Sequence, residues 1–209
     1  MFDPDNAIYR ILYWVECQLI LNIIFITSCI PLITIGTSIC SLYEIQFQLI
    51  RNEETILIKS YWNAFKSNIK TTLIPWMCFI LFCIVSYMWY IGFKSEYWQF
   101  PVVVEILVYT VCFAVFFVSS YFCPVKAFYK LSAIETLKKS VRIAIYAFPL
   151  SIIKFGTIFI PIYVGVHLQL RTIILLGSVW LLFGISMINR INARLFYNRI
   201  MNIVSEKLF

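Results

Sequence analysis

Four charged side chains fall inside apolar stretches of the sequence, where they could carry proton or ion chemistry: Glu16, Glu44, Glu105 and Lys154. A charge inside a bilayer is costly and is a functional candidate by default. With a rise of about 1.5 Å per residue, Glu16, Glu44 and Lys154 each lie roughly 8–11 Å from the same end of their segments. We expect them to form an intramembrane ion pair. Snorkelling of these long side chains and a conductive role are the alternatives.

Other residues that support catalysis or metal binding are scarce. The single histidine is His167, aspartate occurs only at Asp3 and Asp5, and the seven cysteines are scattered without paired spacing. A metal site needs several converging ligands, and isolated thiols in apolar segments pack as small hydrophobic groups. Walker A, nucleophile-elbow and HExxH motifs are absent from the sequence. We therefore predict no catalytic, metal or cofactor-binding residues, and a protein that is not an enzyme.

The composition predicts a membrane protein. Of the 209 residues, 62% are hydrophobic and only 13% are charged, whereas soluble domains average about 25% charged residues. So little polar surface leaves no room for a separate soluble domain. We expect one integral membrane domain over residues 1–209, with lipid and not nucleic acid as the partner of its basic residues.

Six segments are candidates to cross a bilayer, for which about 20 apolar residues are needed. They are residues 11–33, 35–50, 72–93, 101–123, 147–167 and 172–189. The second segment is short and could be tilted or partly interfacial. Prolines support the boundaries, because Pro75, Pro101 and Pro149 fall near segment starts and Pro124 follows the end of the fourth. The prediction is an all-α polytopic bundle of six helices in three hairpins.

Basic residues set the expected orientation. Fourteen of the 17 Lys and Arg residues fall on one side of the six segments, and only Lys94 and Arg171 fall on the other. Positive charge collects on the cytoplasmic side of membrane proteins. We expect both termini in the cytoplasm of a multi-pass protein in a bacterial cytoplasmic membrane.

Two cytoplasmic connectors have helical periodicity. In 52–70 and 131–145, apolar residues recur every three or four positions beside a basic stripe, which predicts two amphipathic surface helices. The basic residues are Lys59, Lys66 and Lys70 in the first, and Lys138, Lys139 and Arg142 in the second. These residues are candidates to bind anionic lipid or to dock on a partner protein.

The stretch between the first two segments predicts a tight reversal. Pro31 ends the first helix, and Gly36 can adopt a positive φ. Thr34, Thr37 and Ser38 can satisfy backbone groups that the turn frees. A structural turn accounts for these residues, and a Thr/Gly-lined substrate gate is the alternative.

Four short motifs follow one another in the first third of the sequence: Pro31-Leu-Ile-Thr-Ile-Gly36, Leu42-Tyr43, Arg51-Asn-Glu-Glu54 and Ala64-Phe-Lys-x-Asn68. Together they resemble the signature of the YesL-like proteins, which are small bacterial membrane proteins with a domain of unknown function. The similarity in order and spacing covers about residues 5–75. Ser41 replaces the usual Ala, and Glu44 stands where an apolar or aromatic residue is common.

This resemblance implies a six-helix or similar membrane fold in Gram-positive-type bacteria. It also implies genes beside carbohydrate ABC importers and glycoside hydrolases, and it supplies no activity. We therefore expect a non-enzymatic accessory protein that contacts the permease subunits of a sugar importer. A small secondary transporter or channel-like protein is the alternative, although no segment is visibly broken in its middle, as binding-site helices of many carriers are.

The orientation can be tested with single cysteines in a cysteine-free background. Cysteines at Lys94 and Arg171 should react with an impermeant thiol reagent added outside intact cells, because both lie on the charge-poor side. Cysteines at Lys66, Lys138 and Lys207 should stay unlabelled until the cells are opened. Labelling of Lys138→Cys in intact cells would contradict the predicted orientation.

Overall fold

The computed structural model describes residues 7–53, 56–94, 102–147 and 184–206, together with positions 151, 153, 156 and 157. Within these ranges every regular element is a helix. They are α1 (Ala7–Ser28), the short 3₁₀ helix η1 (Leu32–Thr34), α2 (Ile35–Ile50), α3 (Leu57–Lys94), α4 (Val102–Tyr129), α5 (Ala133–Tyr146) and α8 (Ile185–Glu206). The predicted all-α class is confirmed for this part of the chain.

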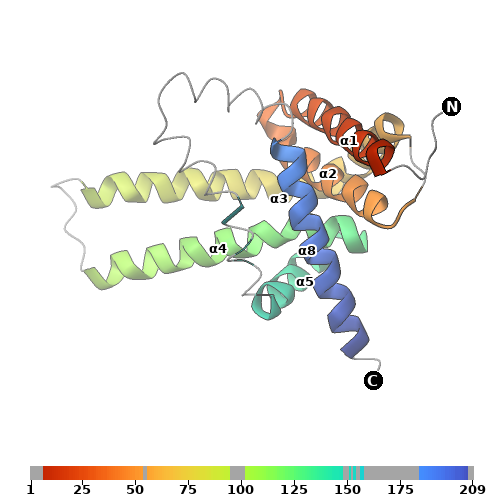
Figure 1. Ribbon diagram of the computed structural model, residues 1–209. Coiled ribbons are helices and arrows are strands. Elements are labelled where there is room, and N and C mark those ends of the chain that lie inside the picture. Colours follow the sequence, from red (N-terminus) through yellow and green to blue (C-terminus); the bar gives the residue numbers. More distant parts are fainter. Residues whose placement is uncertain are drawn as a thin grey trace, which may run out of the picture.

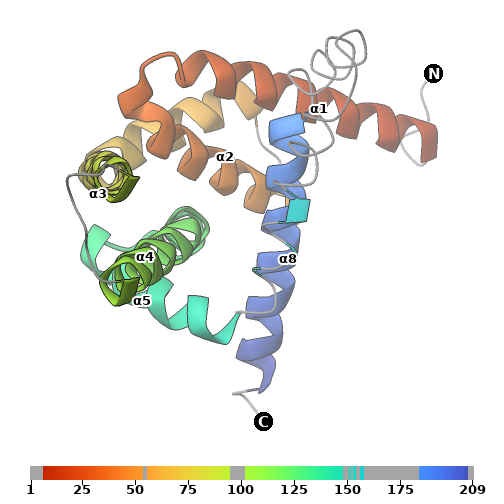
Figure 2. The same ribbon diagram turned by 90° about the vertical axis from the view of Figure 1, so that its left-hand side faces the viewer.

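Helix α2 is at the centre of the fold. It packs against α1, α3, α4 and α8, and nearly all of its residues from Gly36 to Phe47 are buried. In Figure 1, α1, α2, α5 and α8 gather at one end, and α3 and α4 project from them side by side. Figure 2 shows the projecting parts end-on, whereas α1 and α8 run across the view. The predicted bounds of 35–50 match α2, but this helix is enclosed by protein and is not a lipid-facing segment.

Two hydrophobic clusters meet across α2. On one side, Phe47 contacts Phe128 of α4 and Phe196 of α8, with ring centroids 5.5 and 6.0 Å apart. On the other side, Leu42 belongs to a cluster with Leu21 of α1 and Tyr61 of α3, and all three are fully buried. Both faces of α2 therefore contribute to the core.

Helix α3 corrects the prediction of a separate surface helix at 52–70. The connector and the apolar segment 72–93 form one continuous helix of 38 residues, with Pro75 inside it. Proline at a segment start and proline within a long helix are alike in sequence, and hydroxyls such as Thr71 and Thr72 help a membrane helix to tolerate it. In Figure 2 the first part of α3 crosses the view and the later part is end-on, so the helix bends, which we attribute to Pro75.

Two other boundaries also differ from the prediction. Pro124 lies inside α4, which continues to Tyr129 instead of ending before the proline. Helix α8 continues to Glu206, so the basic tail after residue 189 is helical. The helix predicted over 131–145 is present as α5, which starts two residues later, and its place at a membrane surface stays a prediction.

Three of the described helices are long and apolar enough to cross a membrane, in the windows Ile11–Ser28, Leu57–Gly92 and Val102–Tyr129. These helices are consistent with a membrane protein. Most of the predicted segments 147–167 and 172–189 lies outside the described residues. The arrangement of six crossings therefore stays a prediction.

The turn between α1 and α2 uses Gly36 in a way that the sequence did not predict. Gly36 lies in the first turn of α2, and no glycine in the described ranges has a positive φ. Instead, Trp76 of α3 packs against its backbone: a Cβ atom at position 36 would lie 2.7 Å from Trp76 Cγ. Glycine is needed here because the indole ring occupies the space of a side chain.

Replacement of Gly36 by alanine should lower the melting temperature in detergent. Overpacking of this kind costs about 1–3 kcal/mol. The cost should fall in a Trp76→Leu background, where the smaller side chain can move aside, and a double-mutant cycle measures this coupling. Equal costs of Gly36→Ala in both backgrounds would contradict the close-contact explanation.

Candidate functional site

The carboxylate of Glu44, in the middle of α2, is buried and fully partnered. Its side chain is 9% exposed, and Oε1 lies 2.8 Å from Lys130 Nζ. Oε2 accepts a hydrogen bond of 2.8 Å from Asn68 Nδ2 of α3. One carboxylate therefore joins α2, α3 and the end of α4.

Lys130 is held in an unusual backbone conformation at the end of α4. Its φ is 51°, the left-handed region that favours glycine after a helix. The Lys130 N–H donates to the Lys126 carbonyl at 2.9 Å, and Lys126 Nζ donates to the Leu131 carbonyl. The strained residue is a lysine and not a glycine because its side chain is needed to reach Glu44.

Helix α5 begins directly after this corner with a complete capping box. The Ser132 hydroxyl accepts from the Glu135 N–H at 3.4 Å, and Glu135 Oε2 accepts from the Ser132 N–H at 3.3 Å. The Ser132 hydroxyl also donates to Glu135 Oε2 at 2.9 Å, and this hydrogen bond, together with the one from the Ser132 N–H, holds the pKa of Glu135 below its ordinary value. The box is therefore complete above that ordinary value and is lost as the pH falls through the lowered pKa.

The two faces of α5 differ sharply. Small residues, Thr136, Ser140 and Ala144, are buried against the rest of the protein. The opposite face exposes the large apolar residues Ile134, Leu137, Val141, Ile145 and Tyr146. Such a face on a short, firmly mounted helix is available for a membrane surface or for another protein.

The predicted cations on α5 fall into two groups. Lys138 and Arg142 are exposed. Lys139 Nζ instead lies 3.3 Å from the centroid of the Tyr129 ring, and partial burial together with the nearby Arg142 lowers the pKa of Lys139. The other predicted set, Lys59, Lys66 and Lys70, is exposed along the first part of α3.

The structure describes two of the three residues of the predicted ion pair. Glu16 is exposed on α1, whereas Glu44 is buried, and Lys154 lies outside the described residues. The cation that the structure places on Glu44 is Lys130. Sequence reasoning missed it because Lys130 was grouped with the solvent-facing basic residues. The Lys154 pairing stays a prediction.

The turn residues bond as a local cap. Thr34 Oγ1 donates to the carbonyls of Ser28 and Pro31, at 2.8 and 2.7 Å, and Ser38 Oγ donates to the Ser28 carbonyl at 3.1 Å. The expected satisfaction of freed backbone groups is thus seen for Thr34 and Ser38. Thr37 differs, because its hydroxyl pairs with that of Thr72 in α3 at 2.7 Å.

A buried carboxamide cluster joins α1, α2 and α8 and was not predicted. Gln46 Nε2 donates to Gln18 Oε1 at 2.9 Å, and Ser186 Oγ donates to the same oxygen at 2.7 Å. The Ser186 N–H donates to Asn22 Oδ1 at 3.1 Å. The recurrence of Gln18 and Asn22 four residues apart in an apolar segment could have identified this polar helix face.

Carboxylates, thiols and imidazoles do not gather into a metal-binding group within the part of the chain that the structure describes. The arrangement instead offers interaction surfaces and a polar core. The described residues define the class of molecule first: they form an all-helical arrangement in which three helices are able to cross a membrane.

Within that class, residues 19–90 are similar to a family described as "Protein of unknown function, DUF624". This region contains the second half of α1 from Leu19 on, all of α2 and most of α3. It therefore includes Glu44, Asn68 and the Gly36–Trp76 contact, and it ends before Lys130. Neither a curated protein nor a solved structure matches the chain.

Two substitutions at Lys130 separate the ion pair from the backbone strain. Lys130→Met leaves Glu44 buried with one partner and should destabilise the protein by about 2 kcal/mol, between the values for exposed and buried pairs. Lys130→Gly loses the same pair but relieves the strain of the left-handed backbone. Its free energy of unfolding should therefore exceed that of Lys130→Met by about 1 kcal/mol, with a correspondingly higher melting temperature. Thermal melts in detergent measure both, and a Glu44→Gln background should reduce both losses. Unchanged losses in that background would contradict the pairing.

Proposed function

We propose that this protein is a non-enzymatic membrane interaction protein of the YesL-like kind, with α5 as its docking helix. The observation that carries the proposal is the exposed apolar face of α5, in which Ile134 is 69% and Ile145 is 70% exposed. Lys138 and Arg142 border this face. Buried aliphatic and aromatic anchors beside cations are typical of protein–protein contacts.

The rigid mounting of α5 favours a protein partner over lipid alone. The capping box orders its first turn, and the Glu44–Lys130 pair ties the preceding corner to α2. A helix that only rests on lipid gains little from a fixed orientation. A helix that fits a partner binds more tightly when its orientation is set in advance, because less motion is lost on binding.

The first part of α3 supplies a second basic surface. Lys59, Lys66 and Lys70 are exposed there, beside the exposed side chains of Ile58 and Trp62. Helices α3 and α5 contact each other. Together they provide a broad cationic surface on what we take to be the cytoplasmic side.

The proposed partner is the permease subunits of a carbohydrate ABC importer, which the protein would assemble, stabilise or regulate. This identity comes from the gene neighbourhood that the YesL-like resemblance implies. We also propose six crossings of a bacterial cytoplasmic membrane, with both termini in the cytoplasm, on the charge distribution alone. No enzymatic activity, cofactor or nucleic-acid contact is part of the proposal.

One observation favours the second candidate, a small transporter or channel-like protein. Gln18 Nε2 and Gln46 Oε1 are buried between α1, α2 and α8 without a hydrogen-bond partner. Unpartnered polar groups in such a place can hold water or a polar solute. Flux of solute into liposomes that contain only this protein would support this candidate.

Charge reversal on the docking surface tests the proposed function. We expect loss of copurification with the importer's permease subunits in two double variants, Lys138→Glu with Arg142→Glu and Lys66→Glu with Lys70→Glu. The reason is that binding to a protein partner depends on where each complementary charge lies. Both variants should insert and melt normally. The matched control is Arg194→Glu with Arg199→Glu, which reverses two exposed charges on α8 and should leave the complex intact.

Equal loss from the docking and control variants would indicate a general electrostatic effect on anionic lipid, where each cation adds about 1 kcal/mol wherever it lies near the surface. Retention of the complex by all variants would exclude docking through these residues.

A further inference from the structure

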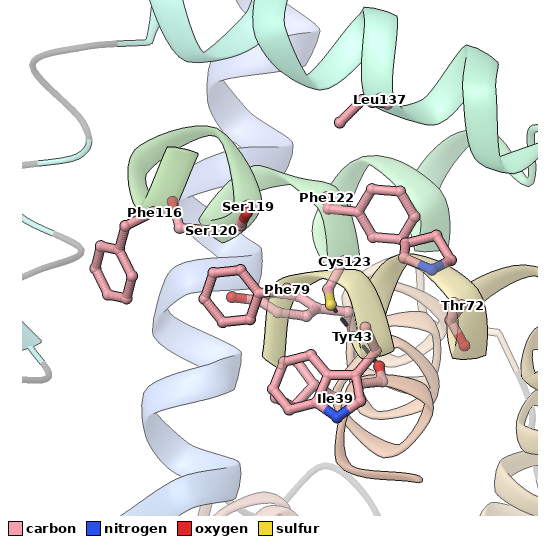
Figure 3. A pocket seen from close by; sticks show the side chains of 13 residues that line it. Ile39, Tyr43, Thr72, Phe79, Phe116, Ser119, Ser120, Phe122, Cys123 and Leu137 are labelled. Atoms are coloured by element: carbon pink, nitrogen blue, oxygen red, sulfur yellow. Dashed lines mark hydrogen bonds between the residues drawn. The ribbon is translucent and has the colours of Figure 1, made fainter. Parts of the chain in front are cut away.

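An apolar cavity of about 320 Å³ lies between α2, α3 and α4, with Leu137 of α5 in its wall. Its volume is near the lower end of ligand pockets, which run from about 300 to 1,000 Å³. The aromatic residues in its wall are Tyr43, Trp76, Phe79, Phe116 and Phe122. Figure 3 shows that Phe79 and Phe116 lie toward one side of the cavity and that Thr72 and Phe122 lie toward the other.

Most polar groups of the wall are already committed to the protein. Ser119 donates to the Val115 carbonyl, Ser120 to the Phe117 carbonyl and Thr72 to the Asn68 carbonyl, at 2.8 to 2.9 Å. Trp76 Nε1 donates to the Leu32 carbonyl at 3.2 Å. An occupant therefore meets a wall that is chemically apolar, despite its serines and threonine.

Tyr43 is the exception. It lines the cavity and is only 5% exposed, yet its hydroxyl has no hydrogen-bond partner among the described residues. A buried phenol normally finds such a partner. A hydrogen-bond acceptor on an otherwise apolar molecule in the cavity would give this hydroxyl a partner.

The position of the cavity supplies such a molecule. Its walls are formed by α3 and α4, two of the helices able to cross a membrane. Both helices expose large apolar side chains beyond the cavity, such as Leu81 and Phe113. The surrounding medium is then the bilayer itself, and an acyl chain can reach the cavity without crossing water.

The direction of α2 orients the occupant. The buried contacts Glu44–Asn68 and Thr37–Thr72 make α2 and α3 antiparallel, so Tyr43 lies toward the basic end and Trp76 lies toward the projecting hairpin. Lys138 follows Leu137 on α5. A phospholipid fits this order of groups: its phosphate lies near the cations of α5, its ester lies at Tyr43, and its chain extends toward Phe79 and Phe116.

We propose that this cavity binds one acyl chain of a membrane phospholipid, whose ester carbonyl accepts a hydrogen bond from the Tyr43 hydroxyl. The inference goes beyond the docking function, although it shares Leu137 and the cations of α5 with the proposed docking face. The two proposals are tested by separate experiments, because copurification reports on docking and tryptophan quenching reports on the cavity. It assigns a lipid-binding role to Tyr43 and Trp76.

Quenching of tryptophan fluorescence by a phosphatidylglycerol with brominated acyl chains tests the proposal in detergent solution. A variant that keeps only Trp76 should show strong quenching that saturates as the lipid is added. A variant that keeps only Trp89, farther along α3, should show weak quenching without saturation. Equal, unsaturated quenching of both would overturn the proposal.

Two substitutions then test the site itself. Tyr43→Phe should raise the half-saturating lipid concentration about fivefold, the equivalent of one hydrogen bond of about 1 kcal/mol. Ser119→Leu fills the cavity and should abolish saturable quenching. Thr110→Val, on an exposed part of α4, is the control and should leave quenching unchanged.

Native mass spectrometry of the full chain gives an independent readout, because it counts retained lipid. One phospholipid should remain on the unaltered protein and on Thr110→Val, and none on Ser119→Leu. A brominated alkane can also be used as the quencher. If its quenching saturates at the same concentration as that of the phospholipid, and Tyr43→Phe has no effect, then the site recognises only the acyl chain and the ester assignment is overturned.

Discussion

The carboxylate of Glu44 imposes a constraint on which much of this structure depends. A charge in the middle of an enclosed helix is tolerable only when donors and a counter-charge surround it. Asn68 and Lys130 meet this need from two different helices, at 2.8 Å each. The positions of α3 and of the α4–α5 corner relative to α2 follow from this single group, since a shift of either would leave the charge unpaired.

The same constraint explains why the neighbouring features are local and strained. Lys130 adopts a glycine-like backbone, and its largely exposed side chain pairs with Glu44. The chain then starts α5 within three residues, with its first turn closed by Ser132 and Glu135. The exposed apolar face of α5 and the cavity wall at Leu137 thus both follow a corner that is tied to the middle of α2.

Much of the secondary structure could be predicted from sequence, but most of its pairing could not. The bounds of α2 were predicted from Pro31 and Arg51, which flank an apolar run, although its role as a full crossing was left open. Helix α5 was predicted because its apolar residues recur at helical spacing. Pro75 was misread because proline at a helix start and proline inside a membrane helix look the same in one dimension. The partner of Glu44 was missed because side-chain reach from Lys130 depends on a left-handed residue that nothing in the sequence marks. Glycine at position 36 was assigned a turn conformation, whereas the packed indole of Trp76 decides its role.

The unbroken length of α3 has a consequence for where the bilayer can lie. At 1.5 Å per residue its 38 residues extend for about 57 Å, nearly twice the ~30 Å of a hydrocarbon core. About half of the helix must therefore stand outside the lipid tails. The half that carries Lys59, Lys66 and Lys70 is the one that water can accept, which leaves the later half, beyond Pro75, to match the membrane thickness. This placement predicts that the bend at Pro75 falls at the boundary between the headgroups and the acyl chains, and that the match between helix length and hydrocarbon thickness sets the depth of the protein.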